Sequence, residues 1–472
     1  MKRRPVLLLF LSAAALLASA PCGLAQQIPP RDPTGRASPR NSSVGGSAPG
    51  ARSSGPSRLT LADAIGLGLR KNLGVLLAGS AIREAQGAEE RSRSALLPKA
   101  EADVPVTLQS RDLRAFGISL PVVPQVVGPF GTYDFRAYFS EPVVDLESYR
   151  HWKSSEKQEQ ASKLDYQDVR ERTIRQVAGL YLQAESAAAR VKAAASRVDT
   201  AQALDDLAEK QHGAGVATGV DVLRAQVALA NERQNLVEAR NAAEQALLAL
   251  ERSIGIDPGA PVVLAETLEF RSFAPPAADA AVAQALAARP DVQALEAQRQ
   301  AILDQQAANR ARYLPRLGID ANYGGIGRTL SDVRQTVFLS ATLRFTLFDG
   351  DRSGERTQID SRLQGIDAQL ADLRRGIAGD VRSALLDLQS AAEAVSVARQ
   401  GEDLAGRELK LARDRFRAGV TDNVEVVTAQ DSLARAQENY IFALTQHVDA
   451  KIALARALGE TEKGFERYVG AP

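Results

Sequence analysis

Two stretches of the chain, Ala214–Leu223 (AGVATGVDVL) and Ala418–Val427 (AGVTDNVEVV), are near-copies of each other. Each ends one long helical pattern at a glycine and begins another after a polar residue, Thr218 or Asp422. A turn of this kind between two long helices is the tip of an αα-hairpin. Because the same tip occurs twice, the sequence predicts an internally duplicated chain.

The composition is that of a helical protein without a bulky core. Of the 472 residues only 5% are aromatic, and Ala, Leu, Gln, Glu and Arg fill long uninterrupted stretches, as in coiled coils. The net charge is +1, with basic and acidic residues mixed, which gives no reason to expect a nucleic-acid partner. The sole cysteine, Cys22, excludes a disulfide framework and a thiolate metal site.

The N-terminus has the layout of a secretory signal peptide. Lys2–Arg4 precede the apolar run Val6–Ala20, which is too short to cross a bilayer as a mature helix. We therefore expect residues 1–25 to be a signal peptide. In the alternative, Cys22 is a lipidated N-terminus, although the preceding proline makes it a poor match. Residues 26–58, rich in Pro, Gly, Ser and Arg, are expected to be a disordered leader, or to lie along a neighbour in an assembly.

Period-two alternation predicts four strands of about nine to eleven residues. In each half a Leu-Pro dipeptide ends a helical pattern, and two alternating segments follow. The predicted strands are Lys99–Leu108 and Tyr133–Ser140, joined by the loop Gln109–Thr132, and then Arg316–Tyr323 and Thr336–Leu347. Strands of this length with one apolar face are typical of transmembrane barrels. A sheet of four strands cannot cross a membrane alone, because its edges would be unpaired in lipid. Other copies of the chain must close it, and three copies would give twelve strands.

The helical periodicity predicts one long helix in each half, residues 146–211 and 351–417, on the order of 100 Å long. Each would face two shorter helices that together match its length. The expected organisation is given by residue range: a first repeat, 59–255; an equatorial linker region, 256–288; a second repeat, 289–459; and a C-terminal tail, 460–472. The expected fold class is mainly α, a rod of long antiparallel helices joined to strands that other copies close into a transmembrane β-barrel.

These features together resemble the TolC family of outer-membrane efflux proteins, over residues 59 to 459. The resemblance rests on the duplicated Ala-Gly-Val tip, the Val-Asp-Val-Leu or Val-Glu-Val-Val after it, and the Leu-Pro dipeptides before the strands. It implies a homotrimer in the outer membrane of a Gram-negative bacterium, with a twelve-stranded barrel and a long periplasmic helical barrel. Its partners would be a periplasmic adaptor (membrane fusion) protein and an inner-membrane transporter.

The resemblance places adaptor docking at the tips, on Gly215, Val216, Gly419 and Val420. From turn chemistry alone, the two glycines would only permit left-handed backbone. Both interpretations are compatible.

The resemblance also implies a periplasmic aperture formed by Glu425, Asp422, Thr428 and Asp221. Glu425 matches an acidic position of the family, and Thr428 stands where some members carry Asp. Three copies of Glu425 near a symmetry axis would favour cations. Alternatively, Glu425 and Asp422 only stabilise a helix N-terminus. Asp221, in the outer hairpin, is expected to make inter-helix links.

The links that hold the tip shut in some members use a Tyr and an Arg, and this chain has Phe416 and Thr421 at those positions. Closure of the tip is therefore expected to depend on packing. In the strands, the side chains expected in the barrel lumen are Arg136, Arg316, Asp320 and Arg344. Soluble sheets also have polar faces, so this assignment depends on the barrel.

The leading functional hypothesis is a passive exit duct of a tripartite efflux pump. The alternatives are a type I secretion duct for a protein substrate and, from another class, a periplasmic coiled-coil scaffold without a pore. An enzyme is disfavoured, because no nucleophile, base or metal cluster has usable spacing, and no cofactor is expected.

Overall fold

The computed structural model describes most of the chain beyond the N-terminal segment. The described residues are 46–47, 57–117, 124–258, 261–266, 268–418, 420–421, 423–464 and 467–468. All of them belong to one compact unit, Ser43–Pro472. The predicted signal peptide and Cys22 lie outside the described residues.

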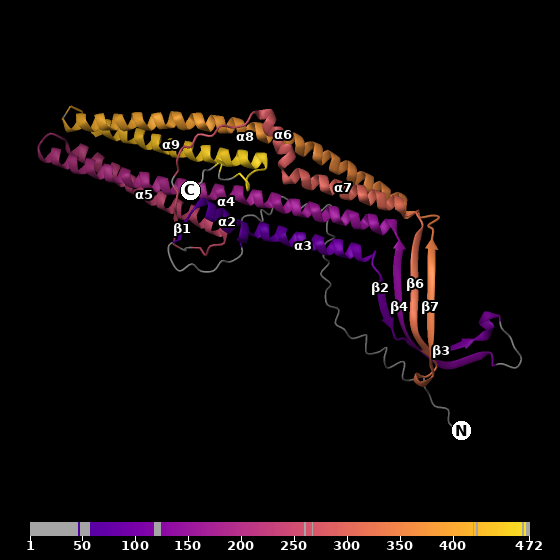
Figure 1. The fold of residues 1–472 in the computed structure, drawn as a ribbon. Helices are drawn as coiled ribbons and strands as arrows, with labels where there is room; N and C mark the ends of the chain where they lie inside the picture. The colour runs from indigo at the N-terminus through magenta and orange to yellow at the C-terminus, as the bar shows by residue number, and fades with distance from the viewer. Residues whose placement is uncertain are drawn as a thin grey trace, which may run out of the picture. The chain divides into compact units, whose positions relative to one another are not determined.

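Long antiparallel helices dominate this unit (Figure 1). The first half contains α2 (Leu61–Lys71), α3 (Leu73–Ser94), α4 (Leu146–Gly213) and α5 (Gly219–Ile254); the second contains α6 (Ala278–Ala288), α7 (Pro290–Ala311), α8 (Asp351–Arg417) and α9 (Asn423–Leu458). With 68 and 67 residues, α4 and α8 each extend on the order of 100 Å. The two predicted long helices are confirmed, and their observed bounds differ from the predicted ones by at most two residues.

Each long helix packs against two shorter ones, as predicted. Helix α4 contacts α3 and α5, and α8 contacts α7 and α9. Contacts of α4 with α7 and α9 join the two halves. Small and branched side chains fill the seams: Val177 and Tyr181 of α4 are fully buried, and so is Val381 of α8. Since each tip follows a long helix and each strand pair precedes one, tips and strands lie at opposite ends of these helices.

The first helical segment is divided in two at Asn72. Thr60 caps α2, and its hydroxyl and the Asp63 carboxylate form a reciprocal capping box. The helix then breaks at Asn72, whose side-chain oxygen accepts a hydrogen bond from Gly74 N at 2.9 Å and caps α3. The Asn72 side chain interrupts the helix because it accepts a hydrogen bond from a backbone N–H group, in competition with the helix itself.

Part of the segment expected to be a disordered leader is ordered. Gly46 O accepts a hydrogen bond from Leu73 N at 2.8 Å, and Ser47 Oγ donates one to Arg252 O at 2.5 Å. Further along, β1 (Ser57–Leu59) pairs in parallel with β5 (Val262–Leu264) from the predicted linker region. The predicted disorder therefore does not extend to these residues.

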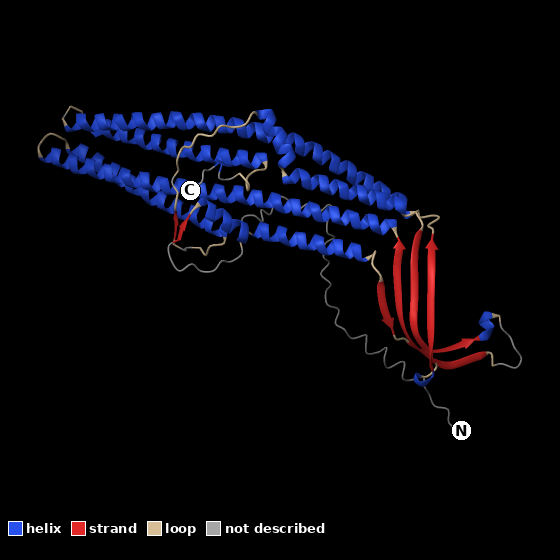
Figure 2. Cartoon of the chain, viewed as in Figure 1, coloured by secondary structure: helices blue, strands red, loops and turns tan. Residues whose placement is uncertain are grey.

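The remaining strands form one antiparallel sheet (Figure 2). It contains β2 (Lys99–Asp103), β3 (Val106–Asp112), β4 (Val126–Val144), β6 (Arg316–Gly327) and β7 (Val333–Arg344). The strand order is β2-β4-β6-β7, and β3 pairs with the first part of β4. The predicted first strand is divided in two at Pro105, because proline has no N–H to donate to the ladder.

Two further strand predictions are wrong. The segment Gln109–Thr132 is not all loop, since β3 runs to Asp112 and β4 starts at Val126; a short 3-10 helix, Leu113–Phe116, follows β3. Strand β4 has 19 residues and β6 has 12, longer than expected, whereas β7 has the predicted 12 residues but runs from Val333 to Arg344 instead of from Thr336 to Leu347. Proline and glycine in this segment suggested a loop, but pairing with a neighbouring strand overrides that local preference.

The register confirms the predicted division into an apolar and a polar face. Phe139 lies opposite Ala321, which in turn lies opposite Leu339, so these side chains share one face. Leu339 is 74% exposed in the single chain. On the other face, Asp320 lies opposite Ser140 and Ser340. One side of the sheet is therefore an exposed apolar surface, and the other is polar.

A glycine determines how closely α2 approaches α4. A Cβ atom on Gly68 would lie 2.8 Å from Val177 Cγ2, whereas one on Gly66 would meet only the end of the Arg70 side chain at 3.5 Å. Alanine stabilises a helix relative to glycine by about 1 kcal/mol. Overlap in a packed seam costs about 1–3 kcal/mol.

We therefore predict that Gly66→Ala raises the thermal midpoint of the purified protein and that Gly68→Ala does not raise it or lowers it. Circular dichroism of both variants measures this, with Gly66→Ala as the matched control. Equal upward shifts of the midpoint would show that the α2–α4 contact has room for a methyl group.

Candidate functional site

The first helical tip is closed by a left-handed glycine. Gly215 has a φ angle of 74°, beyond the end of α4. Gly215 N donates to His212 O and Val216 N donates to Gln211 O, both at 2.9 Å. This is the hydrogen-bond pattern of a Schellman motif, which satisfies the last carbonyl groups of the helix. It leaves the Val216 side chain 65% exposed.

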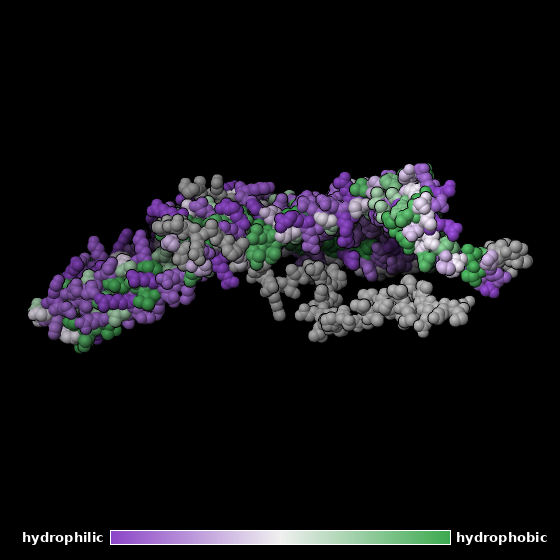
Figure 3. All heavy atoms as spheres, turned by 90° about the horizontal axis from the view of Figure 1, so that it is seen from below, coloured by the Kyte–Doolittle hydropathy of each residue, from purple (hydrophilic) through white to green (hydrophobic). Residues whose placement is uncertain are grey.

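The second tip repeats this arrangement where it is described. Val420 N donates to Arg415 O at 3.0 Å, the bond equivalent to that of Val216, and the Val420 side chain is 68% exposed. Gly419 and Asp422 lie outside the described residues. The two predicted docking tips thus each present an exposed valine beyond the end of a long helix, and Figure 3 shows hydrophobic surface at this end.

Asp221 caps its own helix. Its carboxylate accepts hydrogen bonds from Thr218 N at 2.9 Å and from Thr218 Oγ1 at 2.6 Å. These bonds to Thr218 lower the pKa of Asp221 below its usual value. Both bonds go to Oδ2 and lie within the start of α5, so the expected inter-helix link of Asp221 stays a prediction.

Two side-chain amides join the tips by donating hydrogen bonds to main-chain carbonyl groups. Gln211 Nε2, near the end of α4, donates to Phe416 O at 3.1 Å. Asn423 Nδ2, at the start of α9, donates to Asp221 O at 3.1 Å, and Asn423 is 1% exposed. One bond joins the two helices that enter the tips, and the other joins the two that leave them.

Phe416 supplies packing at the same level. It is 3% exposed, in a cluster whose other buried members are Leu204, Leu409, Ala412, Val426 and Ala429. This cluster draws on α4, α8 and α9, so it holds three of the four helices together at the tip end. The expectation that packing contributes at the position of Phe416 is consistent with these contacts.

Glu425 is paired within its own hairpin. Its carboxylate accepts a hydrogen bond from Arg415 Nη1 of α8 at 2.8 Å, and another from Thr421 Oγ1. The Arg415 and Glu425 side chains are 55% and 36% exposed, so solvent reaches both. Any charge that Glu425 contributes to an aperture is therefore offset by Arg415 in this conformation.

Thr428 borders a groove that the sequence analysis missed. Its hydroxyl donates to Val424 O at 2.8 Å. The groove, of about 450 Å³, lies between the first turns of α5 and α9 and is also lined by Val220, Leu223 and Val227. These three side chains are 53–63% exposed. These three residues are spaced by three and four positions and so form a second apolar stripe on α5. That stripe was the sequence signal from which the groove could have been predicted.

The four predicted lumen residues share the polar face of the sheet. Arg316 lies opposite Arg344, Asp320 lies in the same alternation, and Arg136 lies opposite Gly324 of that face. Two of the arginines have acidic partners: Arg136 Nε donates to Asp134 Oδ1 at 2.7 Å, and Arg316 contacts the Glu147 carboxylate at the start of α4.

Within the described residues, no group of three or more His, Cys, Asp and Glu side chains could hold a metal ion. None of the helices described is both long enough and apolar enough for a bilayer span.

Several known proteins resemble this chain in sequence. CyaE of Bordetella pertussis is 27% identical over 62% of the chain, which matches 64% of the relative's own length. The pyoverdine export outer-membrane protein OpmQ of Pseudomonas aeruginosa is 26% identical, over 80% of each protein. The alkaline protease secretion protein AprF of P. aeruginosa is 24% identical, over 72% of the chain and 73% of the relative.

Solved structures show the same fold. The outer-membrane channel OprN matches with a TM-score of 0.74 and 20% identity, over 85% of this chain and 90% of that one. The Campylobacter jejuni CmeC outer-membrane channel matches with a TM-score of 0.75 and 15% identity, over 91% and 95%. Residues 71–256 and 281–460, one segment in each half, match the Outer membrane efflux protein family. With both halves matched and the channel fold in place, the chain belongs to the outer-membrane efflux protein family, the TolC-like proteins of Gram-negative outer membranes.

Proposed function

We propose that three copies of this chain form a passive exit duct in the outer membrane. The observation that carries this proposal is the open sheet. Among the described strands, β7 pairs only with β6, and β2 and β3 pair only with β4. Both edges therefore leave backbone groups without a strand partner, which a hydrocarbon environment does not tolerate. Closure through two further copies supplies the missing partners and gives a barrel of twelve strands.

The two faces of the sheet support this assembly. Figure 3 shows hydrophobic surface over the strand region. Val337, Leu339 and Leu343 of β7 are 71%, 74% and 55% exposed in the single chain, which suits contact with lipid. The polar face carries Arg136, Asp320 and their neighbours and would line the lumen.

The helical part would continue the duct into the periplasm. Helices α4 and α8, on the order of 100 Å long, are held side by side by the shorter helices. We propose that their tips meet a periplasmic adaptor, which couples the duct to an inner-membrane transporter. Val216, Val420 and the groove beside Thr428 offer exposed apolar surface there. Exposed apolar patches on a soluble surface often mark protein contacts.

The duct would carry out no chemistry of its own and use no cofactor, because the transporter supplies the energy. Of the two cargo classes, small molecules are favoured. The match to OpmQ, whose name refers to pyoverdine export, spans 80% of the chain, against 72% for AprF, whose name refers to protease secretion. A protein-secretion duct is the second candidate.

We retain the proposed organisation of the chain. A signal peptide (1–25) and a leader (26–58) precede the two repeats, 59–255 and 289–459. The linker region 256–288 and the tail 460–472 would form an equatorial belt. Support comes from β5, which pairs with β1, and from Tyr468, which is 2% exposed with its ring centroid 5.0 Å from that of Phe273.

The first prediction concerns assembly. Protein extracted by detergent from the outer-membrane fraction should have a native mass of three chains, because only closure pairs the strand edges. Light scattering or native mass spectrometry measures this. A monomer, or recovery from the soluble periplasm, would contradict barrel closure and favour the pore-less scaffold.

The second prediction concerns the aperture. In planar bilayers with a salt gradient, Glu425→Gln should lower cation selectivity, because it removes three carboxylates from the symmetry axis. Arg415→Gln should raise cation selectivity, because it releases those carboxylates from their ion pairs. Reversal potentials measure both effects.

Asp279→Asn is the control for the aperture variants. It also neutralises one acid, at a side chain in α6 that is 96% exposed and far along the sequence from the tips. Reversal potentials that do not differ between Glu425→Gln and wild type would place Glu425 away from the conduction path.

The third prediction concerns docking. Val216→Asp combined with Val420→Asp should abolish export of a fluorescent substrate from cells that depend on this duct, while conductance of the purified trimer stays unchanged. Val397→Asp, at a side chain of α8 that is 70% exposed, is the matched control and should leave export intact. Normal export by the double variant would exclude the two valines from the contact.

A further inference from the structure

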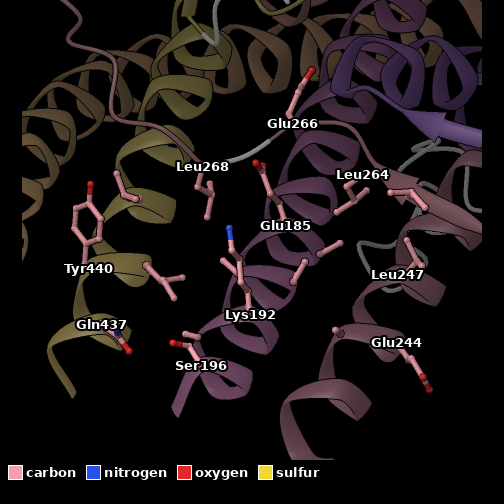
Figure 4. Close-up of a pocket in the computed structure, with 18 of the residues that line it drawn as sticks. Glu185, Lys192, Ser196, Glu244, Leu247, Leu264, Glu266, Leu268, Gln437 and Tyr440 are labelled. Atoms are coloured by element: carbon pink, nitrogen blue, oxygen red, sulfur yellow. The ribbon is translucent and has the colours of Figure 1, made fainter. Parts of the chain in front are cut away.

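A large cavity lies beside the middle of α4, away from the tips and from the antiparallel sheet. Its volume is about 840 Å³, and α4, α5, α8, α9 and the segment that contains β5 all contribute to its walls. Figure 4 shows Leu247, Leu264 and Leu268 among the side chains around it. Alanine side chains of α4 and Leu444 of α9 add to the apolar lining. Its volume and lining are those of a small-molecule site.

One acidic side chain in this wall has a buried oxygen atom that is unpaired among the described residues. Glu185 of α4 is 7% exposed, and its Oε1 atom has no hydrogen-bond partner among the described residues. In Figure 4 its carboxylate lies between the Leu264 and Leu268 side chains. An ionised carboxylate in such surroundings is costly unless a positive group or hydrogen-bond donors compensate its charge.

The environment of Glu185 changes its protonation. Burial, and to a lesser degree the negative charge of Glu266, raise the pKa of Glu185 to about 7. At neutral pH the side chain is therefore divided between its neutral and its charged form. A cation placed against it would favour the charged form.

The other charged groups around the cavity are mostly acidic. Lys192 comes from α4, Glu244 from α5, Glu266 from the segment after β5, and Glu402 from α8. Helix α9 contributes Gln437 and Tyr440, which carry no formal charge. Glu266 accepts a hydrogen bond from Leu61 N at 3.3 Å, and Glu244 points away from the cavity in Figure 4. The excess of acids disfavours an anion in this cavity.

We propose that this cavity binds an organic cation with one positive charge and an apolar body, and that the charge pairs with the Glu185 carboxylate. The leucine and alanine walls would enclose the body of the ligand. A metal ion is a poor candidate, because within the described residues no cluster of three metal-ligating side chains exists. This inference concerns the helical part of the chain and does not depend on the conduction proposed above.

The test uses two dyes with the same xanthene ring system, rhodamine 6G, which is a cation, and fluorescein, which is an anion. Fluorescence polarisation with the purified assembled protein should show saturable binding of rhodamine 6G and none of fluorescein. Rhodamine 6G affinity should fall about tenfold between about pH 8 and about pH 6, because Glu185 takes up a proton over this range. Micelles without protein provide the baseline.

Glu185→Gln removes the charge and keeps the shape. It should weaken rhodamine 6G binding at least about tenfold at the higher pH and abolish the pH dependence. Glu244→Gln, the same change at an exposed side chain of the same cavity, is the matched control and should retain both. Ala188→Leu on α4 reduces the space without altering a charge, so binding should weaken equally at both pH values.

Three results would overturn the proposal. They are the absence of saturable rhodamine 6G binding to wild type, equal binding of fluorescein, and binding by Glu185→Gln that matches wild type. If Glu185→Gln does not assemble, Ala188→Leu decides: unchanged affinity for rhodamine 6G in that variant would place the dye outside the cavity.

Discussion

The requirement that every backbone group in lipid has a hydrogen-bond partner governs this structure. A sheet whose edge strands β2 and β7 pair on one side only cannot satisfy that requirement within one chain. The consequence reaches the helices, because the strands of each half are connected to a long helix. In the proposed trimer, pairing of strand edges between copies would also bring copies of α4 and α8 around a common axis. One rule of membrane chemistry would thus connect a local strand pattern to a tunnel on the order of 100 Å long.

Features specified by nearby residues were predictable from the sequence. The glycines at 215 and 419 and the helical periodicity predicted the tips and the bounds of the long helices closely. Period-two alternation gave the two faces of the sheet. Features that depend on distant partners were not predictable: β4 extends to Val126 because it pairs with β3, and β1 exists because β5 lies beside it. Turn-forming residues in a single sequence carry no information about such partners.

The same distinction applies to the site. The sequence placed the exposed valines and the capped turns, which are local. It did not place the Arg415–Glu425 pair, the bonds of Gln211 and Asn423, or the cavity beside Glu185, because each requires knowing which helices face one another. Asp221 shows the local part of this chemistry: Thr218, three positions before it, donates to one of its carboxylate oxygens.

The two hydrogen bonds between the tips use side-chain donors and main-chain acceptors. Both donors are side-chain amides, Gln211 and Asn423, and both acceptors are main-chain carbonyl groups, of Phe416 and Asp221. Every residue type supplies a carbonyl, so substitution at the acceptor positions leaves the bonds available, whereas loss of either amide removes one. The acceptor side chains have other roles at the tip, because Phe416 packs in the buried cluster and the Asp221 carboxylate accepts from Thr218. The hydrogen-bonded link between the two hairpins therefore depends on two amide side chains, and the packing beside it depends on Phe416.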